Sequence, residues 1–143
     1  MAKAERTEVF EVEIDKVYSA IVDYKSYPDF VTGVNEVEIL EESEDGAKVK
    51  YSIDLIKKLS YVLSLKHTKP TAVSWTFESG DLFKVNEGAW SLKDLGNGTT
   101  EVTYEIEIGI KGFFPGSKMI VNKLTATSLP SMMKSYEKRA KSL

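Results

Sequence analysis

The sequence predicts an α+β protein in which one curved antiparallel sheet wraps around a long C-terminal helix and leaves an internal cavity between them. Three observations predict this fold class: the order of the elements, the strict alternation of apolar and polar residues in the middle of the chain, and one long helical segment at its end. A sheet with one apolar face needs a covering element, and only the last segment is long enough to cover it. We expect the order β-α-α-β₆-α in a single domain, residues 1–143.

The first strand and two short helices are predicted from the N-terminal part of the chain. Apolar residues alternate with glutamates from residue 10 to residue 14, which indicates a strand with one buried face. Asp15 follows at the position of a helix N-cap, where its side chain can accept a hydrogen bond from a free backbone N–H. Pro28 lies in the first turn of a second helix, residues 27–30, where its missing N–H costs little. The first helix is indicated by apolar residues at helical spacing: Val17, Ala20, Ile21 and Tyr24.

Six strands are predicted between the helices and the C-terminal segment. Apolar and polar residues alternate in residues 47–55 and 59–67, and the same period of two recurs in residues 102–110. One polar and one apolar face are typical of an antiparallel sheet that is covered on one side. Between Phe83 and Leu92 the apolar parity slips by one position, and we assign a β-bulge there to Gly88. Glycine-containing hairpin turns are predicted at residues 44–46, 79–81 and 96–98.

The C-terminal helix is expected to span about residues 116–142 and to cover the sheet. Pro130 lies inside this segment, where a proline costs about 3 kcal/mol relative to a regular helix. One interpretation is a kink that follows the curvature of the sheet, and the other is a hinge that opens a portal. The segment also contains six lysine or arginine residues and one acidic residue. This charge suits the C-terminal end of a helix dipole, and the alternative is a docking surface for anionic lipid or RNA.

Composition restricts the function classes. The net charge of −3 argues against a general nucleic-acid binder, and we expect no binding to DNA. The chain contains no cysteine, which excludes disulfides, thiol nucleophiles and cysteine-based metal sites. Neither a signal peptide nor an apolar run of membrane-spanning length is recognisable, so the expected location is the cytoplasm.

Recognisable catalytic motifs are missing from the sequence. The chain has one histidine, His67, but no Gly-x-Ser-x-Gly turn and no nucleotide-binding loop. We therefore predict no catalytic residue, no cofactor and no metal site. His67 falls on the apolar face of its strand, where it is expected to hydrogen-bond to a neighbour. The alternative is a role in polarising a ligand or in transferring a proton.

Several segments together resemble a known superfamily. The block VYSAIVDYKSYPDF is followed by the strand VNEVEIL, by Gly88-Ala89-Trp90 before residues 98–102, and by SYEKRA near the C-terminus. These segments resemble the START-like superfamily, also called SRPBCC or helix-grip, and within it the polyketide cyclase/dehydrase and coenzyme Q-binding branch. The resemblance covers essentially the whole chain. It implies the order β-α-α-β₆-α and an apolar cavity that binds a lipid, an isoprenoid quinone or another flat hydrophobic molecule.

The candidate ligand-binding residues are those expected to face the inside of the sheet or to belong to the elements that cover it. Tyrosine and tryptophan suit such a lining because each combines a large apolar body with one polar tip. The alternative is that these side chains fill the core and leave no void. The candidates are Phe30, Tyr51, Ile53, Tyr61, Leu63, Leu65, His67, Trp75, Phe77, Trp90, Tyr104, Ile106, Leu124, Ser128 and Met132.

We expect the protein to bind or transport a small hydrophobic ligand without catalysis, such as a lipid or an isoprenoid quinone like coenzyme Q. Burying one CH₂ group contributes about 0.8 kcal/mol, so about twelve enclosed carbon atoms contribute about 10 kcal/mol without an ionic anchor. The resemblance leaves two alternatives: a polyketide cyclase/dehydratase-type enzyme in which His67 and a tyrosine handle protons, and a ribosome-associating, toxin-like protein. Phe113 and Phe114 are adjacent aromatics in a Gly/Pro-flanked loop. They are expected either to pack under the start of the C-terminal helix or to form an exposed tip for peripheral membrane contact.

Overall fold

A seven-stranded antiparallel sheet forms the body of the molecule. The computed structural model describes residues 2–54, 58–111 and 129–143. The order of the strands across the sheet is β1-β7-β6-β5-β4-β3-β2, and every neighbouring pair is antiparallel. The strands are β1 (Ala2–Phe10), β2 (Val34–Glu42), β3 (Gly46–Asp54), β4 (Lys58–Thr68), β5 (Ala72–Gly80), β6 (Phe83–Gly96) and β7 (Thr99–Ile110).

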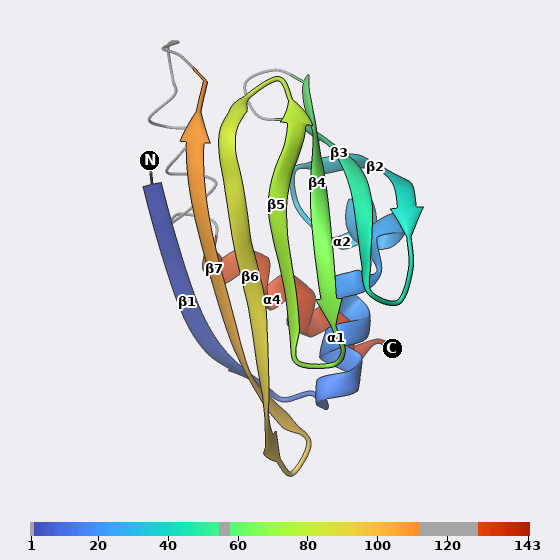
Figure 1. Ribbon diagram of the computed structural model, residues 1–143. Coiled ribbons are helices and arrows are strands. Elements are labelled where there is room, and N and C mark those ends of the chain that lie inside the picture. The colour runs from blue at the N-terminus through green and yellow to red at the C-terminus, as the bar shows by residue number, and fades with distance from the viewer. Residues whose placement is uncertain (1, 55–57, 112–128) are drawn as a thin grey trace.

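The described helices pack together against this sheet. They are α1 (Ile14–Val22), η1 (Tyr24–Ser26), α2 (Tyr27–Phe30) and α4 (Leu129–Lys141). Figure 1 shows the sheet curving around α4, and both α1 and α2 contact α4. This arrangement confirms the predicted fold class, an α+β helix-grip architecture with a C-terminal helix inside a curved antiparallel sheet.

The first strand lies almost wholly before the segment that the alternation predicts: β1 spans Ala2–Phe10, and of the predicted residues 10–14 only Phe10 belongs to it. Ile14, predicted as a strand residue, is the first residue of α1. Glu13 occupies the N-cap of α1, so the prediction of Asp15 as N-cap is wrong, and Asp15 lies in the first turn. The cause is Val12, which is only 5% exposed although it lies in the connection after β1. Its carbonyl accepts a hydrogen bond from Thr100 Oγ1 at 2.8 Å, so alternate burial continues beyond the end of the strand.

The β6–β7 hairpin has the turn predicted at residues 96–98. Asn97 and Gly98 have φ angles of 55° and 75°, and two consecutive positive φ angles define a type I′ turn. This turn suits the right-handed twist of the two strands that it joins. The chain reversal therefore follows from local residue chemistry.

The predicted β-bulge is present in β6, but its assignment to Gly88 is wrong. The register with β7 slips between Phe83 and Val85, so the extra residue is Lys84. Gly88 pairs regularly with Ile106. The shift in the alternation of apolar residues therefore does reflect a bulge in β6. Gly88 is needed for a different reason.

Gly88 is required by the close approach of its neighbours. A Cβ atom at this position would lie 2.1 Å from the backbone oxygen of Glu105 and 2.8 Å from the ring of Trp75. Trp75 is also the last β5 residue that pairs with β6, because the β5–β6 register comprises only the pairs of residues 72–75 with residues 88–91. Glycine inside a strand commonly marks such an approach, and here it makes room for the indole.

α4 turns one side toward the rest of the molecule. Its buried residues are Leu129, Met133, Tyr136 and Ala140, at the spacing of three and four that one helix face requires. Pro130 is the second residue of α4 within its described bounds. Residues 116–128, where the sequence predicts the first half of this helix, lie outside the described part of the chain. The kink and the hinge therefore stay predictions.

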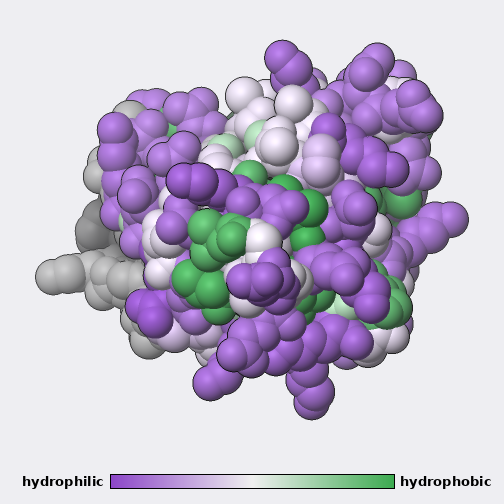
Figure 2. All heavy atoms as spheres, turned by 90° about the horizontal axis from the view of Figure 1, so that it is seen from below, coloured by the Kyte–Doolittle hydropathy of each residue, from purple (hydrophilic) through white to green (hydrophobic). Residues whose placement is uncertain are grey.

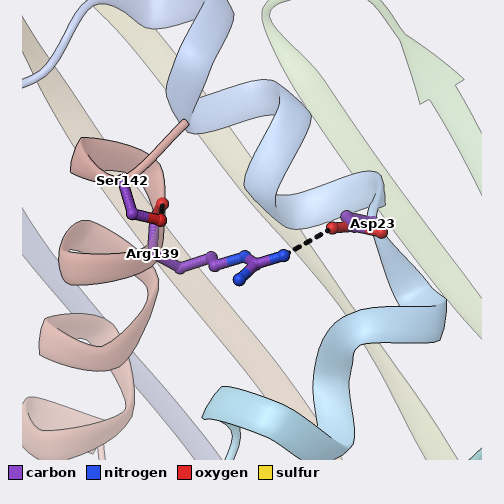
Figure 3. Close-up of polar contacts among 3 residues, drawn as sticks. All are labelled: Asp23, Arg139 and Ser142. Atoms are coloured by element: carbon purple, nitrogen blue, oxygen red, sulfur yellow. Dashed lines mark hydrogen bonds and ion pairs between the residues drawn. The ribbon is translucent and has the colours of Figure 1, made fainter.

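The C-terminal end of α4 is attached to the end of α1 through Arg139 (Figure 3). The Arg139 Nη2 atom lies 3.4 Å from Oδ2 of Asp23, the C-cap residue of α1. The guanidinium carbon also lies 5.6 Å from the centre of the Phe30 ring, within the range of a cation–π interaction. Ser142 Oγ donates a hydrogen bond to the carbonyl of Arg139 at 2.6 Å and satisfies that carbonyl at the helix end.

We expect Arg139→Met to lower the free energy of unfolding by about 1 kcal/mol, because a partly exposed ion pair and a cation–π contact are lost together. Methionine keeps an apolar stem in the same place. Urea unfolding measures the change. Lys138→Met is the matched control on the exposed side of α4 and should shift the free energy by less than about 0.5 kcal/mol. Equal shifts in the two variants would contradict the role given to Arg139.

Hydrophilic side chains predominate on the face shown in Figure 2, where apolar ones gather in small groups between them. None of the helices in the described part of the chain has the length and apolar character that a transmembrane helix requires. Phe113 and Phe114, the candidates for membrane contact, lie outside the described residues. Docking of the basic C-terminal segment on lipid or on the ribosome stays a prediction. The exposed large apolar residues of the described part are Val9, Leu40, Leu95 and Leu143.

Candidate ligand-binding cavity

A cavity of about 430 Å³ lies between the sheet and α4. Ligand pockets in proteins commonly measure about 300–1,000 Å³, so this space is sufficient for a small organic molecule. Side chains from β3, β4, β5, β6 and β7 line it on one side, and α4 contributes Ser131, Met132, Ser135 and Tyr136. The sheet and the helix thus leave a void between them, as the sequence predicts.

Ten of the fifteen candidate residues line this cavity. Those on strands do so because alternate residues of a strand point to the same face of the sheet. Leu124 and Ser128 lie outside the described residues. Whether the lining residues contact a ligand stays a prediction. The ten are Tyr51, Ile53, Tyr61, Leu63, Leu65, Trp75, Trp90, Tyr104, Ile106 and Met132.

Two aromatic candidates pack elsewhere. Phe30 lies edge-on to the rings of Tyr27 and Tyr136, with centroid distances of 5.5 and 5.3 Å. Phe77 is half-buried, and its centroid lies 6.2 Å from that of Phe83. Neither belongs to the cavity lining. Both instead support residues that do, because Tyr27, Tyr136 and Phe83 line the cavity.

His67 is also outside the lining and has hydrogen-bonding neighbours of its own. Its Nε2 atom lies 2.8 Å from the hydroxyl of Tyr24, and the two rings are stacked with centroids 6.0 Å apart. The ring of Tyr18 meets His67 edge-on at 6.4 Å. Tyr18 and Tyr24 come from α1 and η1, which cover this end of β4. The imidazole therefore occupies a structural position of the kind expected for a hydrogen-bonded histidine.

The cavity contains polar residues that the sequence pattern did not single out. Thr32, Asp54 and Ser131 are exposed members of the lining, so the cavity reaches the surface at these residues, which we call the cavity mouth. Asn86 lies on the inner side of β6, buried at 4% exposure. The alternation could have revealed Asn86 only if the bulge had been placed at Lys84 instead of Gly88.

Aromatic rings form much of the fixed lining. Trp90 contacts both Tyr104 and Tyr136, with centroid distances of 4.7 Å in each case. Trp75 lies 5.6 Å from Tyr104 on the neighbouring part of the sheet. Such pairs contribute about 0.5–1.5 kcal/mol each beyond the burial of their area. The contacts hold flat, apolar ring surfaces in defined orientations around the cavity.

The described lining carries little ionic charge. Burial raises the pKa of the hydroxyls of Tyr51, Tyr61, Tyr104 and Tyr136, so these groups are neutral hydrogen-bonding groups at physiological pH. The only ionisable carboxyl in that lining is Asp54, exposed at the cavity mouth. In residues 2–54, 58–111 and 129–143 no group of three or more acidic or histidine residues is placed to hold a metal ion. The chemistry available here is apolar contact with a few neutral polar groups.

A family profile matches almost the whole chain. The family is described as polyketide cyclase / dehydrase and lipid transport, and its profile matches residues 10–136. The chain belongs to this family. This membership, with the observed architecture, confirms the predicted resemblance to the START-like superfamily. The coenzyme Q-binding branch stays a prediction.

Solved structures with low sequence identity share the fold of this polyketide cyclase/dehydrase and lipid transport domain. A START superfamily protein from Mycobacterium smegmatis superimposes with a TM-score of 0.83 at 19% identity, covering 98% of this chain and 97% of that chain. The Zhui aromatase/cyclase from Streptomyces sp. R1128 gives 0.72 at 18% identity, with 99% and 87% covered. Human STARD10 gives 0.74 at 16% identity, with 97% and 63% covered. No match was found among curated proteins.

Proposed function

We propose that this protein binds and carries a small hydrophobic molecule, a lipid or an isoprenoid quinone, in the cavity between the sheet and α4. The observation that carries the proposal is a void of about 430 Å³ lined by aromatic and aliphatic side chains. The description of the family, which includes lipid transport, supports it. Apolar burial alone provides enough affinity, at about 0.8 kcal/mol for each enclosed CH₂ group.

The volume of the cavity limits the size of the enclosed ligand. About 430 Å³ is about three times the ~150 Å³ of an engineered protein cavity that accepts benzene. Two or three fused rings, or an acyl chain of similar volume, fit this space. A quinone with a long isoprenoid tail would place its head group inside and pass the tail through the cavity mouth at Thr32, Asp54 and Ser131.

The geometry supports binding more strongly than proton transfer by His67. A general acid or base must lie within hydrogen-bond reach of the reacting group, directly or through one water. His67 is not part of the lining, and its Nε2 atom is engaged by the Tyr24 hydroxyl. The other proton-bearing groups of the described lining are Asp54, exposed at the cavity mouth, and tyrosines whose pKa burial raises, which makes these tyrosines poor bases at neutral pH.

We expect protein purified without detergent to retain an apolar ligand or to bind an added fluorescent acyl lipid. Native mass spectrometry and solvent extraction detect a retained molecule, and fluorescence titration measures the added one. Trp75→Ala should weaken binding of the fluorescent lipid by about tenfold, because a buried aromatic surface of the lining is removed. Leu40→Ala, on the exposed side of β2, is the control and should leave the affinity unchanged.

Two results would contradict the proposed function. One is the failure of wild-type protein both to release an apolar molecule on extraction and to bind any apolar probe. The other is an affinity of Trp75→Ala equal to that of Leu40→Ala for the same lipid.

A further inference from the structure

Asn86 is an unusual component of the cavity lining. It lies on the inner face of β6 opposite Ile108 and is 4% exposed. Among the described residues only Asn86 and Thr100 are buried polar residues, and the hydroxyl of Thr100 donates to the carbonyl of Val12. Burying an amide costs free energy unless its hydrogen-bonding groups find partners. The position of Asn86 therefore calls for an explanation beyond packing.

The bulge at Lys84 is what turns Asn86 inward. Phe83 is buried, and regular alternation after it would place Val85 inside and Asn86 outside. The extra residue reverses this order, so that Asn86 is buried and Val85 only half-buried. Bulges often re-aim a side chain next to a functional site. Here the bulge replaces an apolar residue of the lining with an amide.

The contact with Trp75 determines the orientation of the side-chain amide of Asn86. The indole Nε1 lies 3.0 Å from Oδ1 of Asn86. Because the indole N–H can only donate, the atom that it contacts must be the amide oxygen rather than the amide nitrogen. The indole of Trp75 occupies the space that a Cβ at Gly88 would need, and its ring centroid lies 5.6 Å from that of Tyr104. The carbonyl of the amide is thus engaged, and its NH₂ group supplies the remaining hydrogen-bonding capacity.

Building on the proposed function, we propose that Asn86 is a specificity-determining residue whose NH₂ group donates a hydrogen bond to an uncharged oxygen acceptor of the ligand. Ketones, quinones and esters carry such an acceptor. No lysine, arginine or histidine belongs to the described lining, so a carboxylate beside Asn86 would be buried without a counter-charge. The site therefore selects neutral, carbonyl-bearing hydrophobic molecules over hydrocarbons of the same shape and over free fatty acids bound with their carboxylate inside.

A matched pair of two-ring probes tests this selectivity. Acetylnaphthalene carries a ketone, and isopropylnaphthalene has nearly the same shape without an acceptor. Trp75 and Trp90 both line the cavity, so quenching of tryptophan fluorescence reports binding of each probe. We expect wild-type protein to bind the ketone more tightly, and Asn86→Leu to weaken ketone binding by about tenfold while hydrocarbon binding is unchanged.

Two further variants separate recognition from structure. Asn86→Leu leaves the indole N–H of Trp75 without its acceptor, so the double variant Trp75→Phe/Asn86→Leu removes both partners and avoids this defect. It should show the same loss of preference for the ketone. Ile108→Val, directly opposite on β7, is the control and should change the affinities for both probes by the same factor. The infrared carbonyl stretch of bound acetylnaphthalene should shift to higher frequency when Asn86 is replaced, because a hydrogen bond to that oxygen is lost.

Equal affinities of wild-type protein for the two probes would overturn the role of Asn86 and leave the proposed function intact. The role of Asn86 is also overturned if Asn86→Leu weakens the binding of both probes equally or leaves the frequency of the carbonyl stretch unchanged. The amide would then serve only as the hydrogen-bond partner of Trp75. If wild-type protein binds neither probe nor any other apolar ligand, the proposed function fails, and the inference fails with it.

Discussion

Above pH 10, we expect the free energy of unfolding to fall steeply and the protein to unfold within about one to two pH units. The cause is the tyrosine content, seven residues in this chain. Burial is the main cause that raises the pKa of all seven above the ordinary value of about 10, and the rise is large in six of them. These six are Tyr24, Tyr27, Tyr51, Tyr61, Tyr104 and Tyr136.

The sign of this effect follows from proton linkage. In the folded protein the six hydroxyls keep their protons above pH 10, whereas in the unfolded chain they lose them near pH 10. Since the unfolded state then binds fewer protons, stability is complete below pH 10 and is lost as the pH rises toward the folded-state values. Each group contributes a slope of about 1.4 kcal/mol per pH unit, so six give about 8 kcal/mol per pH unit. That slope is comparable to the whole stability of a typical domain, about 5–15 kcal/mol.

Circular dichroism and tyrosinate absorbance, recorded together during an alkaline titration, measure this transition. We expect both signals to change at the same pH and over the same narrow range. Tyr61→Phe removes one of the six groups and should make the transition less steep, while retaining the ring. Gradual ionisation of all tyrosines with unchanged circular dichroism would contradict the expectation.

Tyr136→Ala should lower the free energy of unfolding by about 3–5 kcal/mol, the range for removing a buried aromatic ring. The ring lies 4.7 Å from Trp90, 5.3 Å from Phe30 and 5.6 Å from Tyr27, measured between centroids. It therefore joins α4 to β6 and to α2 at once. Its loss removes the main aromatic attachment of the helix and enlarges the cavity that the ring lines.

Tyr136→Phe is the matched control for this substitution. It keeps every ring contact and removes only the hydroxyl, so we expect a change of at most about 1.5 kcal/mol. Urea unfolding of both variants, with binding of a fluorescent lipid measured below the transition, separates stability from binding. If alanine and phenylalanine at this position have the same effect, the ring contacts do not hold α4 in place.

The sheet and most of its inner face could be predicted from the sequence because their cause is local. An antiparallel strand with one covered face alternates in polarity, and the alternation in β3, β4 and β7 identifies residues such as Tyr51, Leu63 and Tyr104 as inward-facing. The edge strand β1 pairs only with β7 and carries a weaker pattern. Its end was misplaced because Val12 is buried without belonging to the strand.

The parts of the cavity that could not be predicted depend on how distant segments meet. Asn86 faces inward because of a register shift against β7, and the sequence shows the slip in parity without showing which residue is extra. His67 follows the alternation of β4, yet α1 and η1 place Tyr18 and Tyr24 around it. Alternation predicts which residues lie on the inner face of the sheet. The packing of the helices decides which of those residues border the cavity.

The short register between β5 and β6 has a mechanical consequence. Only four residue pairs join these strands, ending at Trp75 and Gly88, and beyond that point β5 pairs only with β4 and β6 only with β7. The sheet is thus composed of two leaves, β1-β7-β6 and β5-β4-β3-β2, connected over a short seam. A change in the angle between the leaves would break few interstrand hydrogen bonds. We expect proposed ligands of different size to be accommodated by flexing at this seam, with little loss of backbone pairing.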